Sequence, residues 1–318
     1  MSNSRPPFVL KNLSQLWSHL NDRYGIDVSE LTEMDLGVLR VDRHDGPSWV
    51  ARVFPTTRPL ADLQRDANTL ARLERGGFPA ERLAASDAVT QFEGQGVLVT
   101  TFVPGVTPRG NGRTFAYLGG LLGALHAREG VEAAPGGGWH HLISSGTPKD
   151  EVAALQRLLD DFAPSVRDDD VKAFRSLRAR VNGIDVCDDL PQCLVHPDMV
   201  PTNAIEMEDR SLVIVDWANT GRGPRLWSLA MTLFAAGARD LRLVEKVISR
   251  YVKHSSLTEE ELERLEGVLM ARPLTIHAWE IVHGRSSLGE SPTTIHYLKR
   301  MAAQIALAAR TSFALERE

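Results

Sequence analysis

The chain has 318 residues, which is enough for a sizeable core and for two lobes or domains. Its hydrophobic fraction of 43% and its charged fraction of 24% are ordinary for a soluble globular protein. The net charge of −5 and the isoelectric point near 6.1 argue against a nucleic-acid-binding protein, because such proteins usually carry a basic patch or stripe.

Neither a targeting segment nor a membrane-spanning pattern is visible. The N-terminal segment lacks an apolar signal core, and no run approaches about 20 apolar residues. The two cysteines, Cys187 and Cys193, form no paired framework and lack the spacing of a metal site. We therefore expect a cytoplasmic protein that uses neither a membrane nor nucleic acid as a partner.

The first hundred residues predict a small, mostly antiparallel sheet with helices beside it. Gly25 follows a run with apolar residues at helical spacing and would end this leading helix. Asp45-Gly46 separates two apolar runs and indicates a hairpin turn, because glycine adopts positive φ at low cost. In chain order we expect a helix over residues 10–24, strands over 36–41 and 48–54, a helix over 60–75, and strands near 88–92 and 96–102.

A Pro-Gly turn at Val103-Pro104-Gly105 interrupts the strand pattern and predicts a hinge. Beyond it the pattern is mainly helical, so the chain is predicted to be an α+β protein. Its parts would be a β-rich N-terminal lobe over residues 1–102 and a larger, mainly α-helical lobe over residues 103–318. In chain order we expect helices over 115–127, 150–162 and 168–181, short strands within 194–217, and three or four further helices.

The most specific segment of the chain runs from residue 194 to residue 217. It contains His196-Pro197-Asp198, then Asn203 five residues later, then Asp216 at the end of an apolar β-branched run. Phosphoryl transfer needs metal ions on the phosphates and a carboxylate that orients the accepting hydroxyl group and takes its proton. Asp198 suits that base, and Asn203 and Asp216 carry the oxygen donors that Mg²⁺ prefers. The pattern predicts a kinase of a small molecule.

This segment resembles the aminoglycoside phosphotransferase and choline kinase-like superfamily, whose catalytic loop runs His-Gly-Asp-x-x-x-x-Asn and whose metal segment ends in Asp-Trp. By position, Asp198 matches the catalytic base, and Asn203 and Asp216 match the two metal ligands. Pro197 stands where the family has Gly. The resemblance extends roughly from residue 31 to the end of the chain. It implies a two-lobed protein-kinase-like fold, an N-terminal nucleotide-binding lobe, Mg²⁺, and ATP or GTP as phosphoryl donor.

The nucleotide side of the resemblance departs from the family pattern. Arg52 stands where a strand Lys holds the phosphates, and Asp66 stands where a helix Glu orients that Lys. Because Arg forks bidentately onto a carboxylate, an Arg52–Asp66 pair would span the same gap. The glycine-rich turn over the phosphates is shortened, with only Gly37 in its place. The carbonyl of Thr101 and the amide of Val103 match the backbone groups that meet the purine edge.

Three further residues are expected to have structural roles. His196 would brace the catalytic loop by hydrogen bonding to the backbone. His126, in a Leu-x-x-Leu-His motif that resembles one of the family, would be a structural helix-end residue. Ser228 replaces an Asp that usually braces the catalytic loop in the family, so the bracing is expected to differ here.

The distal helices are expected to wall the pocket for the small-molecule hydroxyl acceptor. His277, Glu280 and His283 recur at three-residue spacing and are predicted to line one helix face. A carboxylate there would pair with an amino group, and the mild acidity of the chain points the same way. We therefore expect an amine-bearing metabolite or antibiotic as acceptor.

Two interpretations of the chain stay open at this stage. The first is a Mg²⁺-dependent O-phosphotransferase that moves the γ-phosphoryl group of ATP or GTP to a hydroxyl group. The second is a catalytically weak, kinase-like module that binds a nucleotide or ligand, and Arg52, Asp66 and the short glycine turn support it. The intact catalytic and metal set favours the first, because a purely binding protein has no chemical reason to carry it.

Overall fold

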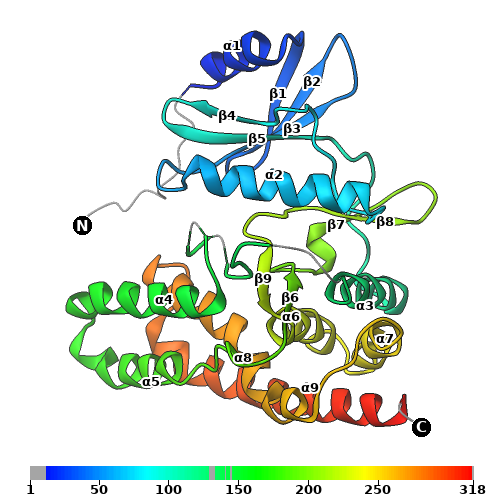
Figure 1. The fold of residues 1–318 in the computed structure, drawn as a ribbon. Coiled ribbons are helices and arrows are strands. Elements are labelled where there is room, and N and C mark those ends of the chain that lie inside the picture. The colour runs from blue at the N-terminus through cyan, green and yellow to red at the C-terminus, as the bar shows by residue number, and fades with distance from the viewer. Residues whose placement is uncertain (1–11, 129–132, 140, 144, 317–318) are drawn as a thin grey trace. The chain divides into compact units, whose positions relative to one another are not determined.

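The computed structural model describes residues 12–128, 133–139, 141–143 and 145–316 (Figure 1). The chain forms two compact units. The first comprises the chain up to Val106 together with Ile205–Ala218, and the second comprises Thr107–Ala204 and Asn219–Glu318. The sequence-based division placed a single boundary after residue 102. The structure differs in that a short segment after the catalytic loop returns to the first unit.

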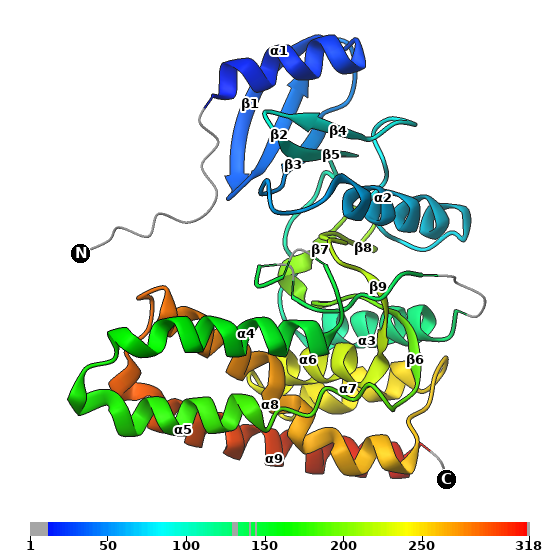
Figure 2. The same cartoon turned by 60° about the vertical axis from the view of Figure 1, so that its left-hand side comes forward.

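The first unit is built on a five-stranded antiparallel sheet with the strand order β1-β2-β3-β5-β4. Residues alternate between buried and half-buried along β3, so Trp49, Ala51 and Val53 face the core while Arg52 faces the other side. The helix α2 lies along this sheet in both views (Figures 1 and 2). The elements are α1 (Leu13–Tyr24), β1 (Val28–Asp35), β2 (Val38–Arg43), β3 (Trp49–Val53), α2 (Leu60–Arg75), β4 (Val89–Phe92) and β5 (Gln95–Thr101).

Close packing fixes α2 on the sheet. A Cβ atom at Gly96 of β5 would lie 2.5 Å from the Leu63 side chain, so only glycine lets the helix approach this closely. The strand β1 was not expected from the sequence, because its residues are mostly polar and half-buried or exposed, as at a sheet edge. Residues 10 and 11 of the expected leading helix lie outside the described residues. A second strand pair, β7 (Ala204–Glu206) with β8 (Leu212–Ile214), belongs almost entirely to the first unit, where isolated bridges join it to Val106 and Ala80.

The second unit is mainly helical. Gly119 and Gly123 let α3 approach α7 closely, because a Cβ atom at either would lie within 2.6 Å of a backbone oxygen of α7. A short antiparallel pair, β6 with β9, leads into the catalytic loop. The elements are α3 (Gly112–His126), α4 (Pro148–Phe162), α5 (Val171–Asn182), β6 (Gln192–Val195), β9 (Gly221–Pro224), α6 (Arg225–Gly237), α7 (Arg242–Tyr251), α8 (Glu259–Val282) and α9 (Ser291–Leu315), with 3₁₀ turns at Ala163–Ser165, Asp168–Asp170, Pro201–Asn203 and Leu288–Glu290.

A hydrophobic core in this unit joins four helices. Apart from Leu288 of a 3₁₀ turn, its members come from α4, α5, α8 and α9, and each helix contributes apolar residues at helical spacing. They include Leu155, Leu159, Phe174, Leu177, Leu274, Ile281 and Leu298. The predicted α+β class, with a small antiparallel sheet and a larger helical part, is confirmed.

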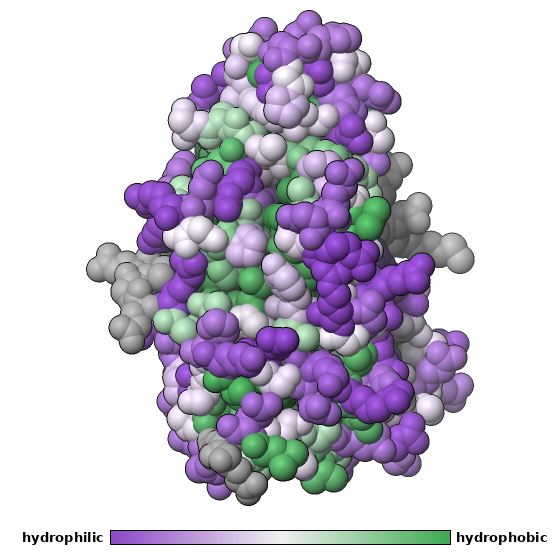
Figure 3. All heavy atoms as spheres, turned by 90° about the vertical axis from the view of Figure 1, so that its right-hand side faces the viewer, coloured by the Kyte–Doolittle hydropathy of each residue, from purple (hydrophilic) through white to green (hydrophobic). Residues whose placement is uncertain are grey.

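Surface composition matches the ordinary hydropathy of the chain. On the face shown in Figure 3, hydrophilic residues lie between groups of hydrophobic ones. Among the described residues, no helix combines the length and the apolar character needed to cross a membrane.

Candidate functional site

The catalytic loop in the second unit is held by neutral hydrogen bonds to its backbone. The loop follows β6 directly and begins at His196, which is fully buried. The Nδ1 atom of His196 accepts a hydrogen bond of 3.0 Å from the backbone N–H of Asp198. From α6, the Ser228 hydroxyl donates to the His196 carbonyl at 2.7 Å. Ser228 therefore braces this loop, although a serine has no carboxylate to offer.

Two predicted site residues of this loop lie together. The side-chain amide of Asn203 donates to the backbone carbonyl of Asp198 at 2.9 Å, and the Val200 N–H donates to the same carbonyl at 3.1 Å. Thr232 of α6 donates to the Met199 carbonyl at 2.8 Å. The Asp198 side chain is half-buried. The backbone of this loop is therefore pinned at several points, and the Asp198 carboxylate extends from a fixed base.

A glycine-rich loop packs against the strand that carries the catalytic loop. Gly137 has φ +93°, and a Cβ atom there would lie 2.7 Å from Cγ2 of Val195, the last residue of β6. The Gly137 N–H also donates to the Asn219 carbonyl at 2.8 Å. Only glycine combines this positive φ with so close an approach to Val195. Gly137 therefore fixes the path of the chain toward Trp139, two residues later.

A buried ion pair fastens the same loop to α4 and α8. Glu151 of α4 and Arg272 of α8 lie 3.3 Å apart, and both side chains are buried. Arg272 also donates to the Gly137 carbonyl at 3.2 Å, and Glu151 accepts the Trp139 N–H at 2.7 Å. Burial raises the pKa of the Glu151 carboxyl, and the Arg272 guanidinium opposes that rise. The pair holds the loop at two backbone groups.

An aromatic cluster lies at the end of this loop. The rings of Trp139 and Trp279 of α8 meet edge to face at 5.5 Å between centroids, and His283 lies 4.3 Å from Trp279. The Arg285 guanidinium lies over the Trp279 ring at 4.6 Å. Arg285 therefore covers a face of the Trp279 ring and makes a cation–π contact with it.

The prediction that His277, Glu280 and His283 line one helix face is wrong. His277 is buried and its Nε2 lies 3.2 Å from the Ser291 hydroxyl at the start of α9, and burial lowers its pKa. Glu280 accepts from the Ser286 hydroxyl at 3.1 Å, and His283 is an exposed residue at the helix end. A three-residue step turns a helix by about 300°, so two steps displace the side chain by roughly a third of a turn.

In the first unit, two predicted site residues form an ion pair that the sequence did not suggest. Arg52 of β3 pairs with the carboxylate of Asp216, which follows β8 at the unusual φ of +66°. Burial of the guanidinium acts to lower the pKa of Arg52, but the carboxylates of Asp216, Glu81 and Asp66 outweigh it, and the pKa is raised.

Asp66, which the sequence suggests as a partner of Arg52, forms an ion pair of 2.6 Å with Arg58, which precedes α2, and both side chains are buried. The charge of Asp66 also helps to raise the pKa of Arg52. Arg58 also lies over the Phe54 ring at 4.6 Å.

Sequence reasoning missed Glu81. This carboxylate is 6% exposed, and its Oε1 accepts the backbone N–H of Asp216 at 2.9 Å while its Oε2 accepts the Thr100 hydroxyl at 3.0 Å. Burial raises the pKa of Glu81, and the charge of Arg52 opposes that rise. In the sequence Glu81 is a single acid directly before Arg82, which is a weak signal.

The remaining predicted nucleotide residues lie at the end of β5. Thr101 is its last residue, and its N–H donates to the Arg82 carbonyl at 2.8 Å. Val103 is half-buried in the segment that follows. Gly105 is required there, because a Cβ atom would lie 2.5 Å from the Glu206 carbonyl oxygen. The glycine turn between β1 and β2 has only two residues, with Gly37 at φ +71°.

The donor chemistry of the predicted metal ligands fits Mg²⁺. The amide nitrogen of Asn203 donates a hydrogen bond to the Asp198 carbonyl, so the amide oxygen of Asn203 is the atom suited to bind a cation. Asp216 offers a carboxylate, and hard oxygen donors with phosphate and water completing the shell are typical of Mg²⁺. Within the described ranges, His, Cys, Asp and Glu residues form no group of three or more that would hold a metal without such help.

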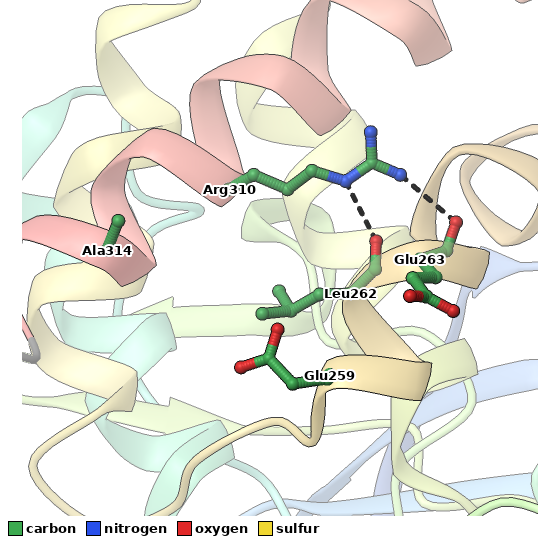
Figure 4. Close-up of a pocket in the computed structure, with 5 residues that line it drawn as sticks. All are labelled: Glu259, Leu262, Glu263, Arg310 and Ala314. Atoms are coloured by element: carbon green, nitrogen blue, oxygen red, sulfur yellow. Dashed lines mark hydrogen bonds between the residues drawn. The ribbon is translucent and has the colours of Figure 1, made fainter.

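A separate pocket of about 470 Å³ contains none of the predicted site residues. Figure 4 shows Arg310 reaching from α9 to α8, where it donates to the carbonyls of Leu262 at 2.8 Å and Glu263 at 3.1 Å. The pocket is lined by Glu259, Leu262, Glu263, Arg310 and Ala314. The hydrogen bonds of Arg310 join α8 to α9, which indicates a structural role for this region.

Comparison with known protein families matches residues 35–268 to the phosphotransferase enzyme family. The chain belongs to this family. The resemblance inferred from the catalytic and metal segments is thereby confirmed, and so is the enzyme class, a small-molecule kinase with an alcohol group as acceptor. A search of curated protein sequences finds no match.

Solved structures with the same fold include kinases of an antibiotic and of choline. Amicoumacin kinase hAmiN, in complex with AMP-PNP, Ca²⁺ and Ami, matches with a TM-score of 0.64 at 14% identity over 91% of this chain and 92% of that one. Choline kinase LicA from Streptococcus pneumoniae gives 0.63 at 14% identity over 92% and 97%. An aminoglycoside-3'-phosphotransferase of type VIII gives 0.55 at 20% identity over 81% and 97%. At these identities the likeness establishes the fold, and the predicted kinase-like fold is confirmed.

Proposed function

We propose that the protein is a Mg²⁺-dependent O-phosphotransferase that moves the γ-phosphoryl group of ATP or GTP to a hydroxyl group of an amine-bearing metabolite or antibiotic. The observation that carries this proposal is the pinned loop from His196 to Asn203, which holds a carboxylate and an amide in fixed register. The similar structure of hAmiN contains AMP-PNP and Ca²⁺, which supports a nucleotide donor and a divalent cation.

Asp198 is the proposed base. Its backbone N–H and carbonyl are both engaged by loop hydrogen bonds, so its carboxylate needs little reorganisation to meet a substrate. The acceptor oxygen bonds to the γ-phosphorus, its proton moves to the Asp198 carboxylate, and the nucleoside diphosphate leaves. His196 holds the loop, and we assign it no proton transfer.

Asn203 and Asp216 are proposed as the metal ligands on the strength of the sequence motif and their oxygen donors. Bound Mg²⁺ would neutralise charge on the transferring phosphates. Arg52 has donors beyond the one that pairs with Asp216, and we propose that these contact phosphate oxygens. Asp66, which pairs with Arg58, would act on the phosphates through its charge.

The purine would meet the backbone of the segment after β5, through the Thr101 carbonyl and the Val103 amide. Both are main-chain groups, so the identity of these two side chains does not select between ATP and GTP. We place the reaction in the cytoplasm, where nucleoside triphosphates are found and where free thiols such as Cys187 and Cys193 stay reduced.

The acceptor is proposed to carry an amine. Support comes from the ring of Trp139, since ring faces attract cations, whereas Arg285 already covers the Trp279 ring. Glu280 and His283 remain candidates for acceptor contacts. His277 leaves the proposal, because it is buried against Ser291.

The first test measures the melting temperature of the protein with Mg²⁺ alone and with Mg²⁺ plus ATP or GTP, beside an Asp216→Ala variant. A ligand that binds only the folded state raises the melting temperature, by an amount equivalent to about 2.7 kcal/mol at a hundredfold excess over Kd. A rise that needs both nucleotide and Asp216 supports the proposal and names the donor.

Absence of any rise at millimolar nucleotide would favour the second hypothesis, a catalytically weak binding module. The two-residue turn before β2 is the observation that favours it, because so short a turn leaves bound phosphates less covered. Phosphorylated acceptor in a screen of amino alcohols and aminoglycosides would remove that hypothesis.

A further inference from the structure

The backbone of Trp139 and of the glycine before it is fixed within the second unit. The Trp139 N–H donates to Glu151 at 2.7 Å, and its carbonyl accepts two N–H groups later in the same loop at 3.0 and 3.1 Å. The Gly138 carbonyl accepts from the side-chain amide of Asn219 at 2.6 Å, and the Gly138 N–H donates to the Gly146 carbonyl at 3.1 Å. Both polar backbone groups of both residues are therefore engaged.

The ion pair of Glu151 and Arg272, which takes part in this fixation, is poorly satisfied. The two side chains lie 3.3 Å apart and are at most 5% exposed. Within the part of the chain that the structure describes, Oε1 of Glu151 and both Nε and Nη1 of Arg272 are buried without a hydrogen-bond partner. The nearby Thr275 hydroxyl donates to the Ala271 carbonyl at 3.0 Å.

Such a pair contributes little to stability. Buried polar atoms without partners cost free energy, and replacing a buried ion pair by apolar residues of similar volume is often neutral or stabilising. What the pair does contribute is two directed contacts to the backbone, from Glu151 to the Trp139 N–H and from Arg272 to the Gly137 carbonyl. These contacts point to a role in placing Trp139.

The indole of Trp139 is half-buried at the end of this fixed segment. It meets the Trp279 ring edge to face, with 5.5 Å between the centroids. Because Arg285 already covers a face of Trp279, Trp139 is the tryptophan of this pair that is suited to a cationic ligand. A ring attracts a cation at its face and not at its edge, so the orientation of the Trp139 indole decides whether an amine is bound.

We propose that Glu151 and Arg272 are positioning residues for Trp139, and that Trp139 selects an amine-bearing acceptor. By holding the Trp139 N–H and the Gly137 carbonyl, the pair sets the direction in which the indole leaves the backbone. The pair acts through Trp139 and is not itself catalytic. This inference rests on the proposed function, because only a cationic acceptor requires an oriented ring face.

An apolar replacement of the pair separates positioning from stability. The double variant Glu151→Leu with Arg272→Met removes both charges and strands neither of them. The matched control is Asp160→Asn with Arg178→Gln, which removes an exposed ion pair of the same unit. KM and kcat are measured with ethanolamine and kanamycin as acceptor probes, nucleotide affinity by calorimetric titration, and folding by melting curves.

A spectroscopic signal reports the orientation of the indole directly. Two tryptophan rings in edge-to-face contact give an exciton couplet in far-UV circular dichroism, and its loss in Trp139→Phe identifies the contribution of Trp139 and Trp279. The couplet should weaken in the double variant and stay at the wild-type level in the control.

The double variant should keep or raise the melting temperature, because it removes buried polar atoms that lack partners. KM for the amine probes should rise about tenfold, the size of one lost cation–π contact, while kcat and nucleotide affinity change by less than about twofold. Trp139→Leu should raise KM by a similar factor. Adding it to the double variant should raise KM no further, because the pair acts through Trp139.

A folded double variant with wild-type KM would overturn the assignment of the pair, and so would an unchanged couplet or additive increases of KM on adding Trp139→Leu. A wild-type protein that phosphorylates neither amine would instead overturn the proposed acceptor class, and this inference with it. If the double variant does not fold, Asn219→Gly provides the second test. Glycine keeps the φ of +60° at this position and removes the amide from the Gly138 carbonyl. KM should then rise about threefold or more, and an unchanged KM would count against the positioning of Trp139.

Discussion

The two units hold their functional side chains by different forces. In the second unit, the loop around Asp198 is pinned by hydrogen bonds between neutral groups, from His196, Asn203 and Ser228 to backbone atoms. In the first unit, ion pairs hold the side chains: Arg52 pairs with Asp216, 164 positions away, and Asp66 pairs with Arg58, eight positions away. Hydrogen bonds to the main chain fix the backbone of the loop, whereas the ion pairs of the first unit depend on the charges of both partners.

The largest expected effect tests the pinned loop. Asp198→Asn should lower kcat about 10²- to 10⁴-fold, because it removes the proposed base while keeping the size of the side chain. Nucleotide affinity and melting temperature should stay close to wild type, since the loop hydrogen bonds use backbone atoms of residue 198. Steady-state kinetics with Asp169→Asn, an exposed acid, as control provides the measurement. Retained kcat would remove Asp198 from the mechanism.

A second effect tests the charge network in the first unit. Arg58→Met leaves Asp66 without its buried partner and should cost about 3–5 kcal/mol of unfolding free energy, measured by urea denaturation. The double variant Arg58→Met with Asp66→Leu should recover most of that loss, because no buried charge is then stranded.

The control for this pair is Arg23→Met, whose partly exposed side chain pairs with the exposed Asp87 in the same unit. Its cost should be about 1 kcal/mol or less, as for exposed ion pairs. Equal losses in Arg58→Met and Arg23→Met would show that the buried pair is no more important than a surface one, and the contrast between the units would weaken.

The same contrast explains what the sequence could predict. The catalytic loop was predictable because His196, Asp198 and Asn203 lie within eight positions, and their contacts are local. The partner of Asp216 was not, since Arg52 is 164 positions away and its pairing depends on how β3 and β8 pack. Family position suggested Asp66 for Arg52, whereas the structure shows the ion pairs Arg52–Asp216 and Arg58–Asp66.

Other elements followed the same division. The strands and helices with clear periodicity, such as β3 and α2, were predicted within a few residues, whereas the polar edge strand β1 was not. Glu81 was not predicted, because a single acid forms no periodic pattern and belongs to no motif. Its hydrogen bonds with the Asp216 N–H and the Thr100 hydroxyl are visible only in the folded chain. Expecting His277, Glu280 and His283 on one face failed on helix geometry alone.

The smallest expected effect tests whether neutral bracing is needed at all. Ser228→Ala removes the hydroxyl that serves the His196 carbonyl and leaves a buried acceptor without that donor. The cost should be about 1–3 kcal/mol of stability, with Ser165→Ala, an exposed hydroxyl on a helix-end carbonyl, changing it by about 0.5 kcal/mol or less. Because the bracing acts on the catalytic loop, kcat should fall while nucleotide affinity stays unchanged. A loss of nucleotide affinity without a loss of kcat would mean that Ser228 supports nucleotide binding instead. The contrast between neutral hydrogen bonds in the second unit and ion pairs in the first would then not correspond to separate functions.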